Sequence, residues 1–96
     1  MRTNGAHILQ VAIEIIEKIP NESIRRVTAA NVAEICAQGK GRFRGEIDEV
    51  ARDQLVSSNV FQNIDHPGGV YAPQSEEIRQ ALAMCVVGND GNLVPN

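Results

Sequence analysis

The residues best suited to chemistry in this 96-residue chain lie in one short segment, GKGRFRG at positions 39 to 45. Three cations, Lys40, Arg42 and Arg44, alternate there with glycines and one aromatic residue, Phe43. Glycines let the backbone approach a ligand closely, and cations at alternating positions can follow the phosphates of a nucleic-acid strand. The segment is therefore predicted to hold an anion, with Phe43 expected to cover the core rather than to stack on a base.

The charge distribution sets this segment apart from the rest of the chain. The net charge is −3, so the molecule as a whole has no general attraction for nucleic acid. Positions 25 to 44 nevertheless hold five basic residues and one acidic residue, a net of +4, against −7 elsewhere. The alternative is an ordinary solvated loop. The predicted nucleic-acid-binding residues are Arg25, Arg26, Lys40, Arg42 and Arg44.

An acidic segment, EIDEVARD, follows the basic one directly. Its acids, Glu46, Asp48, Glu49 and Asp53, do not predict a metal-dependent nuclease, because catalytic carboxylates normally converge on their ions from different elements. We expect a solvated helix face on which Asp48 and Glu49 pair with Arg52. The same four acids form an alternative interface, which would meet a basic protein partner.

Other signatures of catalysis or cofactor binding are missing from the sequence. The basic segment does not match a phosphate-binding P-loop, because Lys40 is followed by Gly41 instead of Ser or Thr. Neither His7 nor His66 has a cysteine at metal-ligand spacing, and no nucleophile stands beside a base. We expect neither an enzyme nor a cofactor or metal.

The composition favours one intracellular domain. The length suffices for a single modest core, and 43% hydrophobic with 22% charged residues is typical of soluble chains. No apolar run has the length of a membrane span, and the first residues lack the apolar region of a signal peptide. A cytoplasmic location without a membrane partner is expected. Cys36 and Cys85 are then expected to be free, buried thiols.

Apolar periodicity and capping residues predict the first two helices. Positions 7 to 20 show the 3.6-residue repeat of an amphipathic helix with a wide apolar face, and Pro20 ends it. ESIRRVT, at positions 22 to 28, is expected to be a short strand. Thr28 is then a suitable N-cap for a second helix, which Gly39 ends.

A third helix and a hairpin are predicted next. EIDEVARDQLVSS shows helical periodicity, and VFQNI and GVYAP flank the turn DHPGG. The inner face of the helix is expected to carry Ile47, Val50, Ala51, Gln54 and Leu55. The inner face of the hairpin is expected to carry Val60, Ile64, Val70 and Ala72.

A fourth helix is predicted for SEEIRQALAM, with Ser75 as its N-cap. Its inner face is expected to carry Ile78, Leu82 and Cys85. Positions 88 to 96 are either a frayed tail or a small hairpin. Because the first helix carries more apolar surface than one side of a small domain covers, we expect a homodimer that uses the first helix, the fourth, or both.

This order of elements resembles a winged helix-turn-helix domain. The resemblance lies in VTAANVAEICAQGKGRFRGEIDEVARDQLVSSNVFQNIDHPGGVYAP, residues 27 to 73, with the first helix as a base. A looser similarity, to the HARE-type helix-turn-helix modules of chromatin and restriction systems, lies in GGVYAP. The resemblance implies a mainly α fold with a small β-hairpin. It implies a winged-helix domain at 1–73, a C-terminal helix at 74–87 packed on it or on a second subunit, and a tail at 88–96.

The resemblance also implies a function, namely DNA binding in a transcriptional or mobile-element regulator. In such domains the third helix enters the major groove and the wing touches the backbone. The third helix here is acidic and would be repelled by phosphates, so contact is expected through the basic loop instead. The alternative is a winged-helix module for protein–protein interaction, which uses the acidic third helix.

Overall fold

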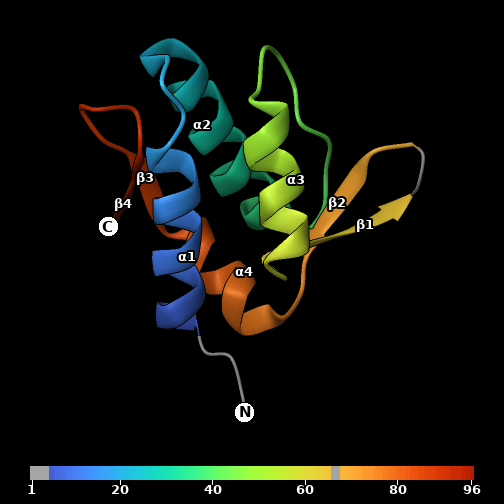
Figure 1. Ribbon diagram of the computed structural model, residues 1–96. Coiled ribbons are helices and arrows are strands. Elements are labelled where there is room, and N and C mark those ends of the chain that lie inside the picture. Colours follow the sequence, from blue (N-terminus) through green and yellow to red (C-terminus); the bar gives the residue numbers. More distant parts are fainter. Residues whose placement is uncertain (1–4, 66–67) are drawn as a thin grey trace.

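The computed structural model describes residues 5 to 65 and 68 to 96 (Figure 1). This part of the chain is mainly α, with four helices and two small antiparallel hairpins. None of its helices combines the length and the apolarity that a membrane span requires. In chain order the elements are α1 Gly5–Glu17, α2 Glu22–Gln38, α3 Glu49–Ser57, β1 Phe61–Asp65, β2 Val70–Pro73, α4 Glu76–Ala83, β3 Cys85–Val87 and β4 Leu93–Pro95.

Helix α2 is longer than predicted, because the segment expected to be a strand forms its first turns. Asn21 caps it, with the Oδ1 atom accepting from the Ile24 N–H at 3.0 Å. The prediction of Thr28 as the N-cap is therefore wrong. Thr28 lies inside α2, where its hydroxyl donates to the Ile24 carbonyl at 2.8 Å and accepts from the Asp48 N–H at 3.0 Å. A cap and tertiary contacts outweigh the strand propensity of the β-branched residues here.

Capping side chains also set the other helix boundaries. Gly39 ends α2 in a left-handed conformation with φ of +90°, as predicted. Ser75 caps α4 as predicted, accepting from the Ile78 N–H at 3.2 Å. Asp48 caps α3, accepting from the Ala51 N–H at 2.8 Å. The third helix therefore begins at Glu49, later than predicted.

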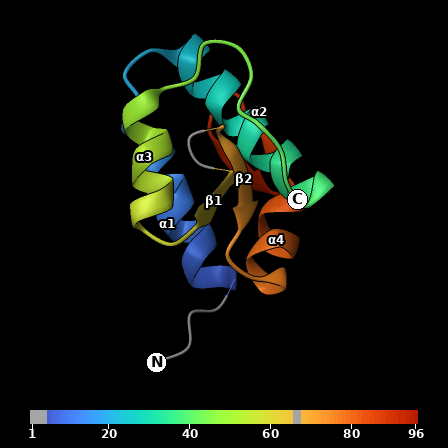
Figure 2. The same cartoon turned by 90° about the vertical axis from the view of Figure 1, so that its right-hand side faces the viewer.

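The core lies where α1, α2 and α4 meet, and α3 closes one side of it (Figures 1 and 2). The apolar stripe of α1 that suggested a homodimer is covered within the chain. Its buried members are Ile8, Ala12, Ile15, Ile16 and Ile19. Helix α4 lies against α1 and α2 of the same chain and buries Ile78 and Leu82. Among the described residues, the exposed large hydrophobic side chains are Val50, Ile64, Met84, Val86 and Val94.

The β1–β2 hairpin forms where it was predicted, but the opposite strand residues face the core. Phe61 and Tyr71 are buried, whereas Ile64 is exposed and the predicted partners Val70 and Ala72 are half-buried. Of the predicted inner set, Val60 alone is buried, and it precedes β1. The aromatic rings decide the phase, since Phe43 meets Phe61 at 6.1 Å and Tyr71 at 5.2 Å, edge-on in both cases. The prediction that Phe43 covers the core is thus confirmed.

The end of the chain forms a second hairpin, one of the two alternatives that the sequence left open. Strands β3 and β4 pair antiparallel, with Val86 opposite Val94 and Val87 opposite Leu93. Leu93 is buried, while Val86 and Val94 face solvent. Cys85 was predicted to lie on the fourth helix, but it belongs to β3. Its side chain is buried, as predicted.

Candidate nucleic-acid interface

The basic segment runs alongside the β1–β2 hairpin. Gly41 and Tyr71 exchange two backbone hydrogen bonds, with N···O distances of 2.9 and 2.8 Å, so the segment pairs with β2 at this point. In extended backbone, successive side chains point to opposite sides. Phe43 turns toward the core, and the residues that alternate with Gly41 and Phe43 are exposed. The exposed residues are Lys40, Arg42 and Arg44.

Asn31 of α2 fixes the second half of this segment. Its Oδ1 accepts from the Arg44 N–H at 2.8 Å, and its Nδ2 donates to the Arg44 carbonyl at 2.9 Å. The same Nδ2 also donates to the Val27 carbonyl at 2.8 Å. The backbone at Arg44 is thereby held while its side chain stays in solvent. Sequence reasoning missed Asn31, whose signal is a polar amide within an otherwise apolar helical turn.

A hollow of about 110 Å³ lies between the basic segment and α2. Arg42 and Arg44 border it on one side, and Asn31, Glu34 and Gln38 border it on the other. Guanidinium groups are the donors that phosphate oxygens accept from most strongly. Glu34 opposes an anion, although its carboxylate also accepts from Gln38 Nε2 at 3.1 Å. The hollow is thus bordered by two basic side chains and one acidic side chain.

Arg42 also ties the basic segment to the hairpin. Its guanidinium lies 3.5 Å from the Asp65 carboxylate and donates to the Gly68 carbonyl. Both charged side chains are more than half exposed, so the pair contributes little to stability. His66, which follows Asp65, lies outside the described residues.

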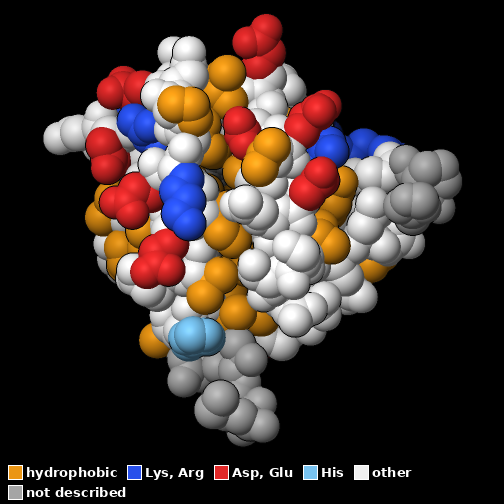
Figure 3. Space-filling view, viewed as in Figure 1, with side chains coloured by type: hydrophobic (Ala, Val, Ile, Leu, Met, Phe, Trp, Pro, Cys, Tyr) orange, Lys and Arg blue, Asp and Glu red, His pale blue; other side chains and the backbone are white. Residues whose placement is uncertain are grey.

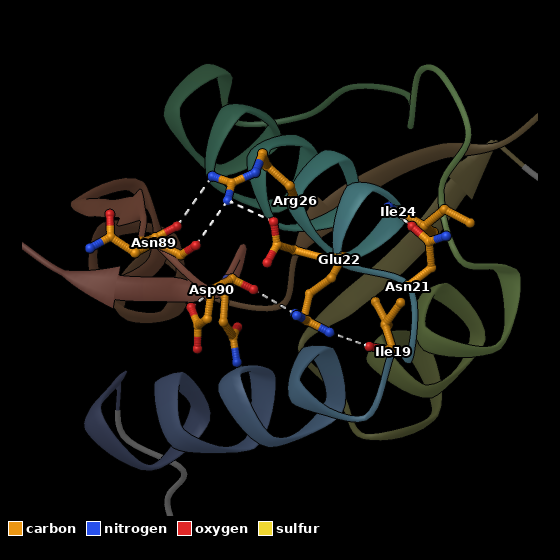
Figure 4. Close-up of polar contacts among 10 residues, drawn as sticks. Ile19, Asn21, Glu22, Ile24, Arg26, Asn89 and Asp90 are labelled. Atoms are coloured by element: carbon orange, nitrogen blue, oxygen red, sulfur yellow. Dashed lines mark hydrogen bonds and ion pairs between the residues drawn. The ribbon is translucent and has the colours of Figure 1, made fainter.

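Arg25 and Arg26 do not join the other predicted cations. They face a different side of α2, toward the turn between β3 and β4 (Figure 4). Arg25 donates to the carbonyls of Asp90 at 2.7 Å and Ile19 at 2.5 Å. Arg26 donates to the carbonyls of Gly88 at 3.2 Å and Asn89 at 3.1 Å, and lies 3.6 Å from Glu22. These contacts hold the hairpin to α2.

The four predicted acids are divided between α3 and the segment before it. Glu46 is exposed ahead of the helix, Asp48 is the cap, and Glu49 and Asp53 are exposed on α3. The predicted pairing of Arg52 with Asp48 and Glu49 is wrong. Arg52 instead contacts Asp53 at 3.3 Å, because the Asp48 carboxylate is occupied by the helix N-terminus. Acidic side chains gather over this helix in Figure 3.

The remaining chemically active groups are scattered or inert. Among residues 5–65 and 68–96, no three His, Cys, Asp or Glu side chains come close enough to hold a metal ion. Cys36 and Cys85 are free and buried. Burial raises the pKa of Cys36 to about 12 and also raises the pKa of Cys85. Both thiols therefore stay protonated near neutral pH and are poor nucleophiles.

Comparisons with protein-family models, with curated proteins and with solved structures found no match to this chain. The function is therefore inferred from the placement of the chain's own side chains.

Proposed function

We propose that this chain is a nucleic-acid-binding module, with DNA as its ligand, that contacts phosphates through the basic segment 39–45. The observation that carries the proposal is the exposure of Lys40, Arg42 and Arg44 along one short segment that pairs with β2 at Gly41. Three cations spaced in this way neutralise successive phosphates and release their counterions. The hollow beside Arg42 and Arg44 gives one phosphate a place to settle.

The winged helix-turn-helix arrangement is supported by the order of α2, α3 and the β1–β2 hairpin, and an isolated bridge joins Gly41 to Tyr71 of that hairpin. The acidic α3 is a poor reader of the major groove, since Glu49 and Asp53 are repelled by the phosphates around it. Among the bases, a carboxylate accepts chiefly from the cytosine amino group. The proposed contact is therefore to the backbone and is independent of base sequence.

Fluorescence anisotropy with duplex DNA at several salt concentrations tests this proposal. Replacement of Lys40, Arg42 and Arg44 by alanine is expected to weaken binding to all sequences alike and to flatten the slope of log affinity against log salt by up to about 2.7. Lys18, an exposed cation just after α1, supplies the control, and Lys18→Ala is expected to leave the slope unchanged. Glu49→Gln with Asp53→Asn is expected to tighten binding by relieving repulsion.

Two results would count against nucleic-acid binding by this segment. If the triple alanine variant keeps the affinity and the salt slope of the wild type, the segment is not the contact surface. If the wild type fails to bind DNA at low salt, the proposed function is wrong.

A second candidate function is protein interaction through the acidic α3. The observation that favours it is the exposure of Val50, which is 65% accessible next to Glu49 on this helix. An aliphatic side chain beside carboxylates is better suited to burial against a protein partner than to a phosphate-lined groove.

A further inference from the structure

A groove of about 250 Å³ lies between the C-terminal part of α1 and the first turns of α3. Ile15 of α1 and Ile19, just after it, border the groove on one side, and Val50 and Ala51 of α3 border it on the other. Figure 3 shows hydrophobic side chains between these helices. An occupant would therefore meet a mainly aliphatic surface.

Val50 is the residue that makes this groove unusual. It was predicted to lie on the inner face of α3, but it is the most exposed large hydrophobic side chain among the described residues. Ile15 and Ala51 are covered, at 9% and 2% accessible. Val50 is thus exposed beside two buried apolar residues. An aliphatic side chain bound in the groove would remove Val50 from water.

The charge around the groove selects the kind of occupant. Lys18, just after α1, and Asp48, the cap of α3, border the groove. Glu46 before α3, and Glu49 and Asp53 on it, are exposed nearby in the sequence. Arg52 contacts Asp53, so these two charges offset each other. With this pair set aside, three acids, Glu46, Asp48 and Glu49, stand against Lys18. The surroundings of the groove are therefore net acidic, which favours a cationic occupant and disfavours a phosphate backbone.

We propose that this groove docks a short amphipathic segment of a protein partner. One or two aliphatic side chains of that segment enter between α1 and α3, and its Lys or Arg residues lie beside Glu49 and Asp53. This is the helix-in-groove mode of peptide recognition, with an apolar anchor and a charged rim. The inference rests on the second candidate function, protein interaction through α3, and is independent of phosphate binding by segment 39–45.

The test is a titration of the full isotope-labelled chain, followed by amide NMR shifts, with two synthetic helical peptides. Both carry leucines at the same spacing, one with flanking lysines and the other with flanking glutamates. The basic peptide is expected to shift amides of residues 15–20 and 48–54 and to bind more weakly as salt increases. The acidic peptide is expected to leave these amides unchanged.

Two sets of variants separate the apolar and the charged contributions. Val50→Ser is expected to weaken binding of the basic peptide about tenfold, because the substitution removes a buried aliphatic contact without changing charge. Ile64→Ser is the matched control, since Ile64 is exposed on the β1–β2 hairpin, and it is expected to leave peptide binding unchanged. Glu49→Gln with Asp53→Asn is expected to weaken peptide binding severalfold and to reduce its salt dependence.

Each other outcome overturns a defined part of the inference. The basic peptide could shift the α3 amides and yet bind Val50→Ser as tightly as the wild type. In that case the acidic surface of α3 is still a binding site, but the groove is not part of it. If neither peptide binds at millimolar concentration, the groove and the second candidate function both fail. If the groove amides shift with protein concentration alone, a second copy of the chain is the occupant. Equal binding of both peptides rejects the selection by charge.

Discussion

Asn31 and Arg44 are joined by a reciprocal pair of hydrogen bonds, although thirteen positions separate them in the sequence. The amide side chain of Asn31 accepts from the Arg44 N–H at 2.8 Å and donates to its carbonyl at 2.9 Å. A side chain of α2 thus makes the two bonds that a neighbouring strand would otherwise make. This contact holds the backbone of the basic segment against the helix.

Asn31→Ala is expected to destabilise the chain by about 1–2 kcal/mol, because the backbone groups of Arg44 lose their partner. Hydrogen exchange at the Arg44 amide should become faster, and chemical denaturation should give the loss of unfolding free energy. Gln38→Ala is the control, since the Gln38 amide bonds to an exposed Glu34 and not to the segment. Unchanged exchange at Arg44 in the Asn31 variant would show that the contact does not order the segment.

Arg25→Ala is expected to destabilise the β3–β4 hairpin and to leave nucleic-acid binding unchanged. The Arg25 guanidinium bonds two carbonyls, of Asp90 and Ile19, and charge-assisted bonds of this kind contribute about 1.5–3 kcal/mol each when well shielded. Arg25 is half-buried, so a total loss of about 1–3 kcal/mol is expected. Denaturation measures the loss, and Arg44→Ala is the comparison in DNA binding. If the slope of log DNA affinity against log salt flattens as much in Arg25→Ala as in Arg44→Ala, Arg25 also contacts the DNA.

Cys36 is expected to resist alkylation in the folded chain and to react after unfolding, and Cys85 to behave alike. The folded pKa of Cys36, about 12, lies above its ordinary value of 9.0. The folded state therefore keeps the thiol proton longer than the unfolded state does. The resulting stability is fully present below pH 9 and is lost as the pH rises toward 12. Denaturation between these pH values should show a smaller loss in Cys36→Ala, and rapid labelling of native Cys36 would contradict its burial.

A homodimer through the first or fourth helix was predicted from the sequence. The apolar faces of these helices are covered, so we propose the β3–β4 hairpin as the dimer surface instead. The stripe of α1 is covered within the chain, whereas Met84, Val86 and Val94 face solvent at the β3–β4 end. Light scattering at high micromolar concentration is expected to give the mass of a dimer. Val86→Asp with Val94→Asp is expected to give a monomer of unchanged helix content, while Ile64→Asp, on the other hairpin, serves as the control. A monomeric wild type would end the proposal.

Local signals predicted the parts of the fold that depend on neighbouring residues. The helical repeat of α1, the left-handed Gly39 at the end of α2 and the Ser75 cap of α4 were all predicted correctly. Each depends on residues within about one helical turn, which a sequence shows directly. The exposure of Lys40, Arg42 and Arg44 followed from their alternation with Gly41 and Phe43.

Contacts between distant positions decided the rest. The first turns of α2 were predicted as a strand, since their β-branched residues favour that form locally, but Thr28 bonds Asp48 and the helix is buried on the core. The sequence predicted the wrong inner face for the β1–β2 hairpin. Phe61 faces the core because its ring packs edge-on against Phe43, which is distant in the sequence. Arg25 and Val50 were also predicted wrongly, because contacts with distant parts of the chain decide their surroundings. The β3–β4 turn engages the arginine, and the space beside Ile19 decides whether the valine is covered. The type of a residue limits the contacts that it can make. Its burial and its hydrogen-bond partners are decided only when folding brings distant residues together.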